Sequence, residues 1–309
     1  MKTGSGRGRW LWGGLLAGLL ALALILFVTH RPTLLERAKQ LPTSGNLPLL
    51  ELNVSPDGKW EATMEDSARI RVQEREGERS FRWDSVHTDQ QGNAQALAEV
   101  AWLPDSRRWI GRVEETPEKA LLFSVDIPGG RGVPVPLPKG TQMLLGITAD
   151  YRLFTSDVNP HPDTSQNPPP PPGTPPPAPP TALTINTVGL YPNNTPESQV
   201  TIPLPANMEL HDLVLSPQGD RLLWVFSATR APNFGAFLTR IFPFLKSRFT
   251  PRTVVSLQVS RLDGKDRHEI GYMDGDASKG DPIDHVRWAQ DGKRAGFLYN
   301  STLYAVPVD

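Results

Sequence analysis

Four ionisable residues that could act together occupy equivalent places in repeated segments of this chain. Each lies three positions before the last apolar residue of a strand-like run; they are Glu51, Glu99, Asp212 and His285. If these runs line a common axis, the side chains converge, and neighbouring carboxylates and a His shift one another's pKa. Such a group could hold a cation or perform acid–base catalysis. The alternative is structural, with each polar side chain bonded to backbone or water; the fifth equivalent residue is the apolar Leu144.

The sequence contains none of the common motifs for other chemistry. There is no GxSxG or HExxH motif, no phosphate-binding glycine loop, and no Cys for thiol catalysis, disulfides or thiolate metal sites. The 32 basic and 33 acidic side chains are balanced, whereas nucleic-acid-binding domains usually carry a clear basic excess. We therefore expect no metal, no cofactor and no nucleic-acid partner.

The four residues belong to a unit that recurs along the chain. In each copy an apolar run enters a turn rich in Pro, Asp or Gly, which suit tight turns, and a second run follows. The copies are LELNVSPDGKWEAT, LAEVAWLPDSRRWIGRV, MLLGITADYRLFTSDV, LHDLVLSPQGDRLLWVF and IDHVRWAQDGKRAGFLY. Further strand-like runs follow, giving about four strands per unit at a spacing of about 40–50 residues. This pattern is typical of a β-propeller, so we expect an all-β propeller of five or six blades over residues 48–309.

The best-preserved turn, at residues 55–59, reads SPDGK. It resembles the signature of the TolB-type, WD-repeat-like propeller, in which an apolar strand with an aromatic residue leads into Ser-Pro-Asp-Gly-Lys. Residues 216–219 and 291–293 match in part, and Trp102 and Trp288 occupy the aromatic position. The resemblance extends over nearly the whole predicted propeller and implies fold far more than function. Such repeats occur in periplasmic scaffold proteins and in peptidase-associated propellers, commonly with six or more blades.

The last unit lacks an outer strand, because only STLYAVPV follows its first two strands. An exposed sheet edge invites pairing with other chains, and propellers often cover it with an N-terminal segment. We expect residues 45–50, GNLPLL, to supply the missing strand.

The N-terminus predicts a membrane anchor. Residues 10–28 carry no charge and span about 28 Å as a helix, close to the hydrocarbon core of a bilayer. A cleaved signal peptide has a shorter apolar region and a small-residue cleavage site, neither of which is present. We expect a signal-anchor helix at residues 10–29, between a cytoplasmic tail at 1–9 and a juxtamembrane linker at 30–47.

The flanking charges indicate the orientation of this anchor. Basic residues lie on both sides of it, but only the group before it has no acidic neighbour. We therefore expect a single-pass protein whose large C-terminal domain is extracytoplasmic, in the periplasm or at the cell surface.

Two segments interrupt the repeat. Residues 159–180, NPHPDTSQNPPPPPGTPPPAPP, form a proline tract, and Pro favours extended polyproline II over strand pairing. The tract is read either as a solvated, disordered loop or as a ligand for an aromatic-lined groove on a partner.

The second interruption, residues 229–252, is basic and rich in Phe. Its apolar members fall at helical spacing, and they are Phe234, Phe237, Leu238, Ile241 and Leu245. Its basic members include Arg240, Lys246 and Arg248. The segment either caps the propeller with packed Phe side chains, or docks on anionic lipid or a protein partner.

These observations favour a membrane-anchored binding scaffold with a protein partner in the cell envelope. The alternative is a propeller hydrolase or lyase that uses the carboxylate and His ring. No catalytic residue is assigned under the first reading.

Overall fold

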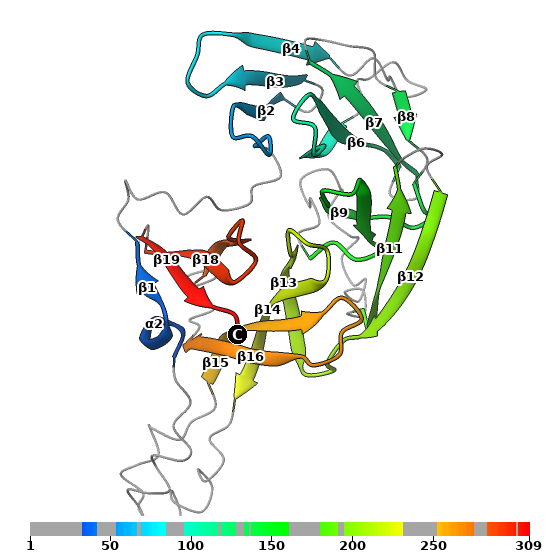
Figure 1. Ribbon diagram of the computed structural model, residues 1–309. Helices are drawn as coiled ribbons and strands as arrows, with labels where there is room; N and C mark the ends of the chain where they lie inside the picture. The colour runs from blue at the N-terminus through cyan, green and yellow to red at the C-terminus, as the bar shows by residue number, and fades with distance from the viewer. Residues whose placement is uncertain are drawn as a thin grey trace, which may run out of the picture.

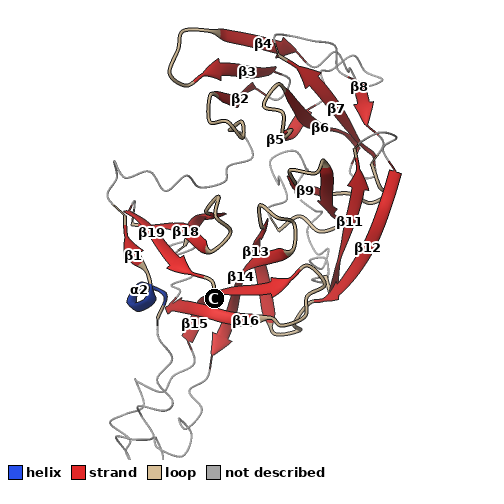
Figure 2. Cartoon of the chain, in the orientation of Figure 1, coloured by secondary structure: helices blue, strands red, loops and turns tan. Residues whose placement is uncertain are grey.

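The computed structural model describes residues 33–41, 54–66, 69–84, 96–116, 119–127, 133–135, 137–160, 180–190, 195–230, 252–274, 283–300 and 302–309. Their strands form sheets that follow one another around a ring, as Figure 1 and Figure 2 show. Within each sheet every strand is antiparallel to its neighbour. The all-β propeller predicted from the repeat is thus confirmed.

We number the sheets as blades in chain order. Blade one contains β2 (Trp60–Asp66), β3 (Arg69–Glu74) and β4 (Ser80–Asp84). Blade two contains β5 (Ala96–Trp102), β6 (Arg108–Thr116), β7 (Lys119–Asp126) and β8 (Val133–Val135). Blade three contains β9 (Met143–Ile147), β10 (Arg152–Ser156), β11 (Ala182–Gly189) and β12 (Thr195–Pro203).

Blade four contains β13 (Met208–Leu215), β14 (Arg221–Arg230), β15 (Arg252–Arg261) and β16 (His268–Asp274). Blade five contains β17 (Asp284–Trp288), β18 (Arg294–Tyr299), β19 (Thr302–Pro307) and, as its outer strand, β1 (Lys39–Gln40).

The number of complete blades differs from the prediction. Among the described residues, four sheets have four strands and the sheet of blade one has three. Before β2 the chain makes only an isolated bridge between Val54 and Glu61. Five or six blades were expected, and four of the described sheets are complete. Blade one is the incomplete sheet, because its inner strand is described only at the bridge between Val54 and Glu61.

Apolar clusters hold neighbouring blades together. Trp83 and Trp109 meet edge to face between blades one and two, with ring centroids 5.2 Å apart. Leu144 and Ile110 belong to the cluster between blades two and three. Phe154 belongs to the cluster between blades three and four, and Trp288 belongs to the cluster between blades four and five. Blade packing of this kind accounts for the core.

The repeated turn is similar in every blade, although it is one residue shorter in blade three. The N–H of the residue after the first strand donates across the turn to the backbone carbonyl five residues on, or four residues on in blade three, with N···O distances from 2.8 to 3.0 Å. One residue of each turn has a positive φ; these residues are Gly58, Ser106, Tyr151, Gly219 and Gly292. Two of them are not glycine, which explains why SPDGK is hard to recognise in blades two and three.

The outer strand of blade five comes from the N-terminus, but not from the residues expected. Lys39 and Gln40 pair with Ala305 and Tyr304 of β19, and Leu41 N donates to Leu303 O at 2.9 Å. Residues 45–50 lie outside the described part of the chain. The principle of N-terminal completion was right and the segment was wrong.

A short helix, α2 (Leu34–Arg37), precedes this strand and fixes its position. Thr33 and Glu36 form a capping box at its start, and Thr33 also bridges Tyr272 of β16. Leu34 is fully buried in the cluster between blades four and five, and the Arg37 guanidinium donates to Ile270 O. Residues 33–41, expected to be part of a linker at 30–47, therefore belong to the folded ring.

The predicted anchor at residues 10–29 lies outside the described residues. In the part of the chain that the structure describes, no helix is both long and apolar enough to cross a membrane.

Candidate functional site

The innermost strands β5, β9, β13 and β17 contact one another in sequence around the ring. Where each of these strands pairs with the next strand of its blade, it has one extra residue without an opposite residue, which makes a β-bulge. The extra residue is Ala98 in blade two, Leu145 in blade three and His211 in blade four. In blade five the bulge includes His285, whose φ is +50°. Bulges redirect side chains, so this repeated feature determines what faces the axis.

The candidate ring residues lie at these bulges. Glu99 and Asp212 each follow the extra residue directly, and His285 lies within the bulge of blade five. Two of the four predicted side chains are described: Asp212 is half-buried and His285 is exposed. Glu51 and the side chain of Glu99 lie outside the described part.

Asp212 takes part in an ion pair between blades. Its Oδ2 lies 3.8 Å from Nη1 of Arg287 on β17, and the two side chains are 17% and 34% exposed. Asp212 Oδ1 accepts from Leu213 N at 2.8 Å, while Arg287 Nη1 donates to Val286 O at 2.7 Å. The carboxylate thus connects the inner strands of blades four and five.

A second bond joins the same two strands. Trp288 Nε1 donates to Val214 O at 3.0 Å. Together with the Asp212 ion pair, it joins the inner strands of blades four and five. Among the described residues, no group of three or more His, Asp or Glu side chains is placed to hold a metal ion.

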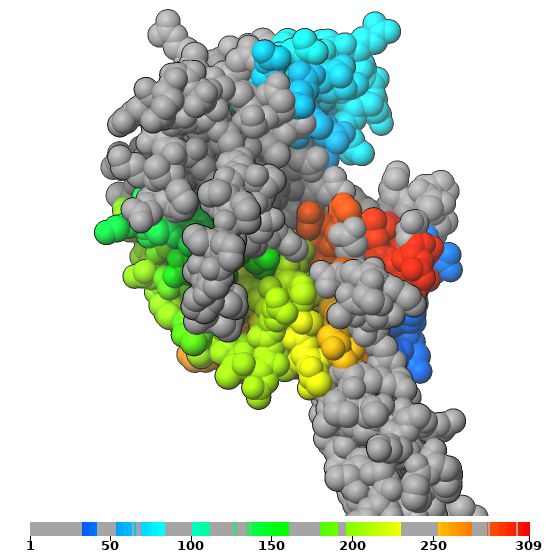
Figure 3. All heavy atoms as spheres, turned by 180° about the vertical axis from the view of Figure 1, so that it is seen from behind, coloured from blue at the N-terminus to red at the C-terminus, as the bar shows by residue number. Residues whose placement is uncertain are grey.

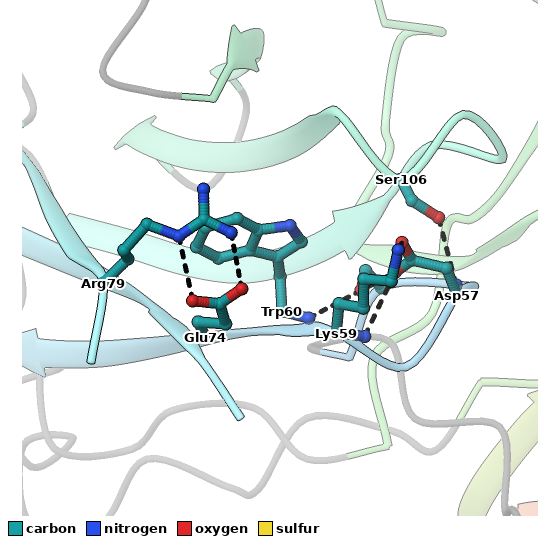
Figure 4. A network of polar contacts seen from close by, with 7 residues as sticks. Asp57, Lys59, Trp60, Glu74, Arg79 and Ser106 are labelled. Atoms are coloured by element: carbon teal, nitrogen blue, oxygen red, sulfur yellow. Dashed lines mark hydrogen bonds and ion pairs between the residues drawn. The ribbon is translucent and has the colours of Figure 1, made fainter. Parts of the chain in front are cut away.

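The Asp side chains of the repeated turns accept hydrogen bonds from residues of the same turn. Ser55 Oγ donates to Asp57 Oδ1 at 2.7 Å, and Lys59 N donates to the same oxygen at 3.1 Å. Partial burial raises the pKa of Asp57, but these hydrogen bonds outweigh burial and hold it below its ordinary value. Figure 4 shows this turn, with Asp57 N donating to Ser106 Oγ of blade two at 3.0 Å.

Turn aspartates of other blades accept hydrogen bonds in the same way. The hydroxyl of Thr148 donates to Asp150 and lowers its pKa. Lys293 N donates to Asp291 Oδ1 at 2.9 Å and lowers the pKa of that carboxyl. These aspartates therefore stabilise the repeat, and their lowered pKa values have a structural origin.

Figure 4 also shows a polar group at the rim of blade one. The Arg79 guanidinium binds Glu74 with two hydrogen bonds and lies 5.2 Å from the centroid of the Trp60 ring. The hydrogen bond from Arg79 lowers the pKa of Glu74. This group closes the β3–β4 hairpin over the aromatic residue that follows SPDGK.

Both insertions occupy the same place in adjacent blades. The proline tract lies between β10 and β11 of blade three, and the basic segment lies between β14 and β15 of blade four. In the other blades this connection has two residues. Because strands alternate in direction, the connection lies at the end of the blade opposite to the SPDGK-type turn. The predicted docking residues between Phe234 and Arg248 lie outside the described residues.

Sequence reasoning missed Arg287 and the bulges. Arg287 is one residue before the aromatic position of its repeat, where period-two alternation alone gives no sign of an ion pair. The signal that could have found it is the basic residue two positions after His285, opposite an Asp in the preceding repeat.

The ring defines a β-propeller, and comparison with solved structures gives other proteins with partial likeness. The chain is 11% identical to the tricorn protease, with a TM-score of 0.43, over 86% of this chain and 26% of that one. It is 13% identical to the Kuenenia stuttgartiensis hydrazine synthase, with a TM-score of 0.45, over 83% and 71% of the two chains. For an oligogalacturonate lyase in complex with manganese the identity is 10%, the TM-score 0.45, and the shares 83% and 76%. No family model and no curated protein matches the chain.

Proposed function

We propose that this chain is a single-pass membrane protein whose propeller lies outside the cytoplasm and serves as a scaffold for a protein partner in the cell envelope. The observation that carries this proposal is the position of the N-terminal segment. Thr33 bridges β16 only four residues beyond the end of the predicted anchor at residue 29. Such a short connection would hold the propeller close to the membrane at a defined edge, that of blades four and five.

The position of the basic insertion supports membrane contact at the same edge. Thr33 pairs with Tyr272, which pairs with Ser256, four residues from the start of β15 at Arg252. At about 3.3 Å per residue, the insertion begins about 13 Å along the strand from the N-terminal bridge. Phe and Leu could then enter the headgroup region while Arg and Lys bind anionic lipid.

A binding experiment tests the docking step. We expect a chain that starts at residue 30, which keeps every described residue, to bind vesicles that contain anionic lipid. Phe237→Asp with Ile241→Asp should abolish this binding and leave folding intact. If the double variant fails to fold, these residues belong to the core and the docking proposal is wrong.

We also propose that the repeat is of the TolB type and that the ring has five blades. The support is the turn itself, because a backbone hydrogen bond between residues three positions apart, donated by a residue of positive φ, recurs five times. No observation on the described residues favours the hydrolase or lyase alternative, since Asp212 is bound by Arg287.

Membrane extraction and capture test the function as a whole. The full chain should stay with the membrane through alkaline carbonate washing, whereas a chain starting at residue 30 should be released. Affinity capture of the full chain from its native membrane should recover one envelope protein reproducibly. Release of the full chain by carbonate would contradict the anchor, and capture of nothing beyond the chain would contradict the scaffold.

A further inference from the structure

Arg267 carries a charge that the described part of the chain does not neutralise. It lies directly before β16 and is half-buried, and its Nη1 is buried without a hydrogen-bond partner. Burial is the one cause that acts on its pKa, so no carboxylate, that of Glu269 on β16 included, lies close enough to hold the charge. A half-buried guanidinium without a counter-charge is unfavourable, so a stabilising role does not account for Arg267.

Both aspartates of the hairpin between β15 and β16 bind other residues. Asp263 Oδ1 accepts from Lys265 N at 3.1 Å, and its Oδ2 lies 3.2 Å from Lys265 Nζ. Asp266 Oδ2 lies 3.8 Å from Arg261 Nη1. Two basic residues of the hairpin are therefore paired with its own aspartates, and Arg267 is left with an uncompensated positive charge.

Two aromatic rings hold the guanidinium of Arg267 in place. It lies 5.7 Å from the ring centroids of both Trp224 and Phe226, which are fully buried and stacked 5.6 Å apart. Trp224 Nε1 donates to Ser260 Oγ at 2.8 Å, which fixes the indole ring. Of the guanidinium nitrogens only Nη1 is a buried atom without a partner, so the edge formed by Nε and Nη2 is open to solvent.

The hairpin that carries Arg267 packs against blade three. A Cβ added at Gly264 would lie 2.5 Å from Ile202 Cγ2, and Leu262 packs against the cluster between blades three and four. Figure 1 shows this hairpin beside the end of β12, and the space-filling view in Figure 3 shows the two blades, coloured green to orange, side by side. Arg267 therefore lies at the outer rim of the ring, where blades three and four meet.

We propose that Arg267 is a binding site for a carboxylate group, which it holds through Nε and Nη2. The planar fork of a guanidinium matches the two oxygens of a carboxylate, and the aromatic rings hold that fork in position before the ligand arrives. The site offers one uncompensated charge and has Asp263, Asp266 and Glu269 close by in the chain. A single negative charge therefore suits it better than the double charge of a phosphate. The inference stands on the contacts of Arg267 and does not depend on the proposed function.

Melting temperatures of the full chain in detergent micelles at pH 7 test the site, with sodium acetate and sodium chloride compared at equal ionic strength. A ligand that binds the folded state raises the melting temperature. We expect a larger rise with acetate than with chloride in the unmodified chain, and no such difference in Arg267→Met. Arg261→Met is the matched control, because Arg261 lies in the same hairpin and is already paired; it should respond like the unmodified chain. Arg267→Lys keeps the charge without the fork and should show a smaller rise.

The Nε–H resonance of Arg267 in the unmodified chain gives a direct measurement that needs no variant to fold. It should shift saturably with acetate or with a terminally blocked peptide that contains one Glu. A response to the peptide alone would support an acidic peptide as the source of the carboxylate, and a response to acetate would support a small acid as well. An unmoved resonance, or equal rises in melting temperature with and without Arg267, would overturn the site. A larger response to inorganic phosphate than to acetate would overturn the assignment to a carboxylate.

Discussion

Leu34, in the N-terminal segment, lies directly against Gly271 in the outer strand of blade four. A Cβ added at Gly271 would lie 2.9 Å from Leu34 Cδ1 and 3.0 Å from Leu34 Cα. The backbone of α2 thus approaches β16 as closely as a glycine allows. This contact joins the N-terminal segment to the ring and places β1 beside β19.

Truncation of Leu34 should therefore weaken the whole propeller. Leu34 is fully buried, so Leu34→Ala should lower the free energy of unfolding by about 2–4 kcal/mol through lost burial and a cavity. Leu35→Ala is the matched control, because Leu35 is adjacent in the same helix and 36% exposed. Thermal and denaturant unfolding of both variants checks this. Equal effects of the two substitutions would show that α2 is not part of the cooperative core.

Two glycines with the same φ separate turn strain from blade packing. Gly58 has φ +72° with nothing near its missing Cβ, whereas Gly219 has φ +73° and its Cβ would lie 2.6 Å from Thr148 Cγ2 of blade three. Gly58→Ala should lower the free energy of unfolding by about 1 kcal/mol, because alanine is strained in the left-handed backbone conformation. Gly219→Ala should cost about 1–3 kcal/mol more, from the clash between blades. Indistinguishable losses in urea unfolding would contradict the contact between the turns of blades three and four.

Arg267 should be dispensable for stability. Its guanidinium lies 5.7 Å from the ring centroids of both Trp224 and Phe226, and its buried Nη1 has no hydrogen-bond partner among the described residues. Burial lowers the pKa of Arg267, because the charged guanidinium loses hydration in the folded protein. Arg267→Met keeps apolar contact with the rings and removes the unpaired charge.

We expect Arg267→Met to be neutral or to stabilise the protein by about 1 kcal/mol. Arg261→Met is the comparison, at an exposed site where the ion pair to Asp266 spans 3.8 Å, and it should change little. Calorimetric melting temperatures measure both. A clear loss of stability in Arg267→Met alone would mean that the cation–π contacts outweigh the buried charge.

Acid should unfold the propeller through its turns. The folded state lowers the pKa values of Asp57, Asp150 and Asp291. Their contribution to the free energy of unfolding is therefore fully present above the unfolded-state pKa, and it is lost as pH falls through the folded-state pKa values. The loss should therefore begin below about pH 4. Asp57→Asn should be less stable at pH 7 and show a shallower fall in stability on acidification. An equally steep fall would exclude the turn carboxylate as a source of acid sensitivity.

The sequence predicts the propeller fold because the turns repeat, but it cannot place the features that break the repeat. The outer strand of blade five has only the residues Lys39 and Gln40, too few for a period-two pattern, and the buried side chain that positions it is Leu34. Counting back three positions from Leu215 reaches Asp212 without crossing the bulge at His211, but position within one repeat gives no sign of the partner Arg287 on the next blade.

The central claim is that the propeller lies outside the cytoplasm behind a membrane anchor, and single-cysteine labelling tests it most directly. Lys265→Cys introduces a thiol at an exposed site in the β15–β16 hairpin, and Ser5→Cys introduces one in the N-terminal tail. In intact cells a membrane-impermeant maleimide should label Lys265→Cys fully and Ser5→Cys only after lysis. Labelling of Ser5→Cys and protection of Lys265→Cys in intact cells would contradict the account.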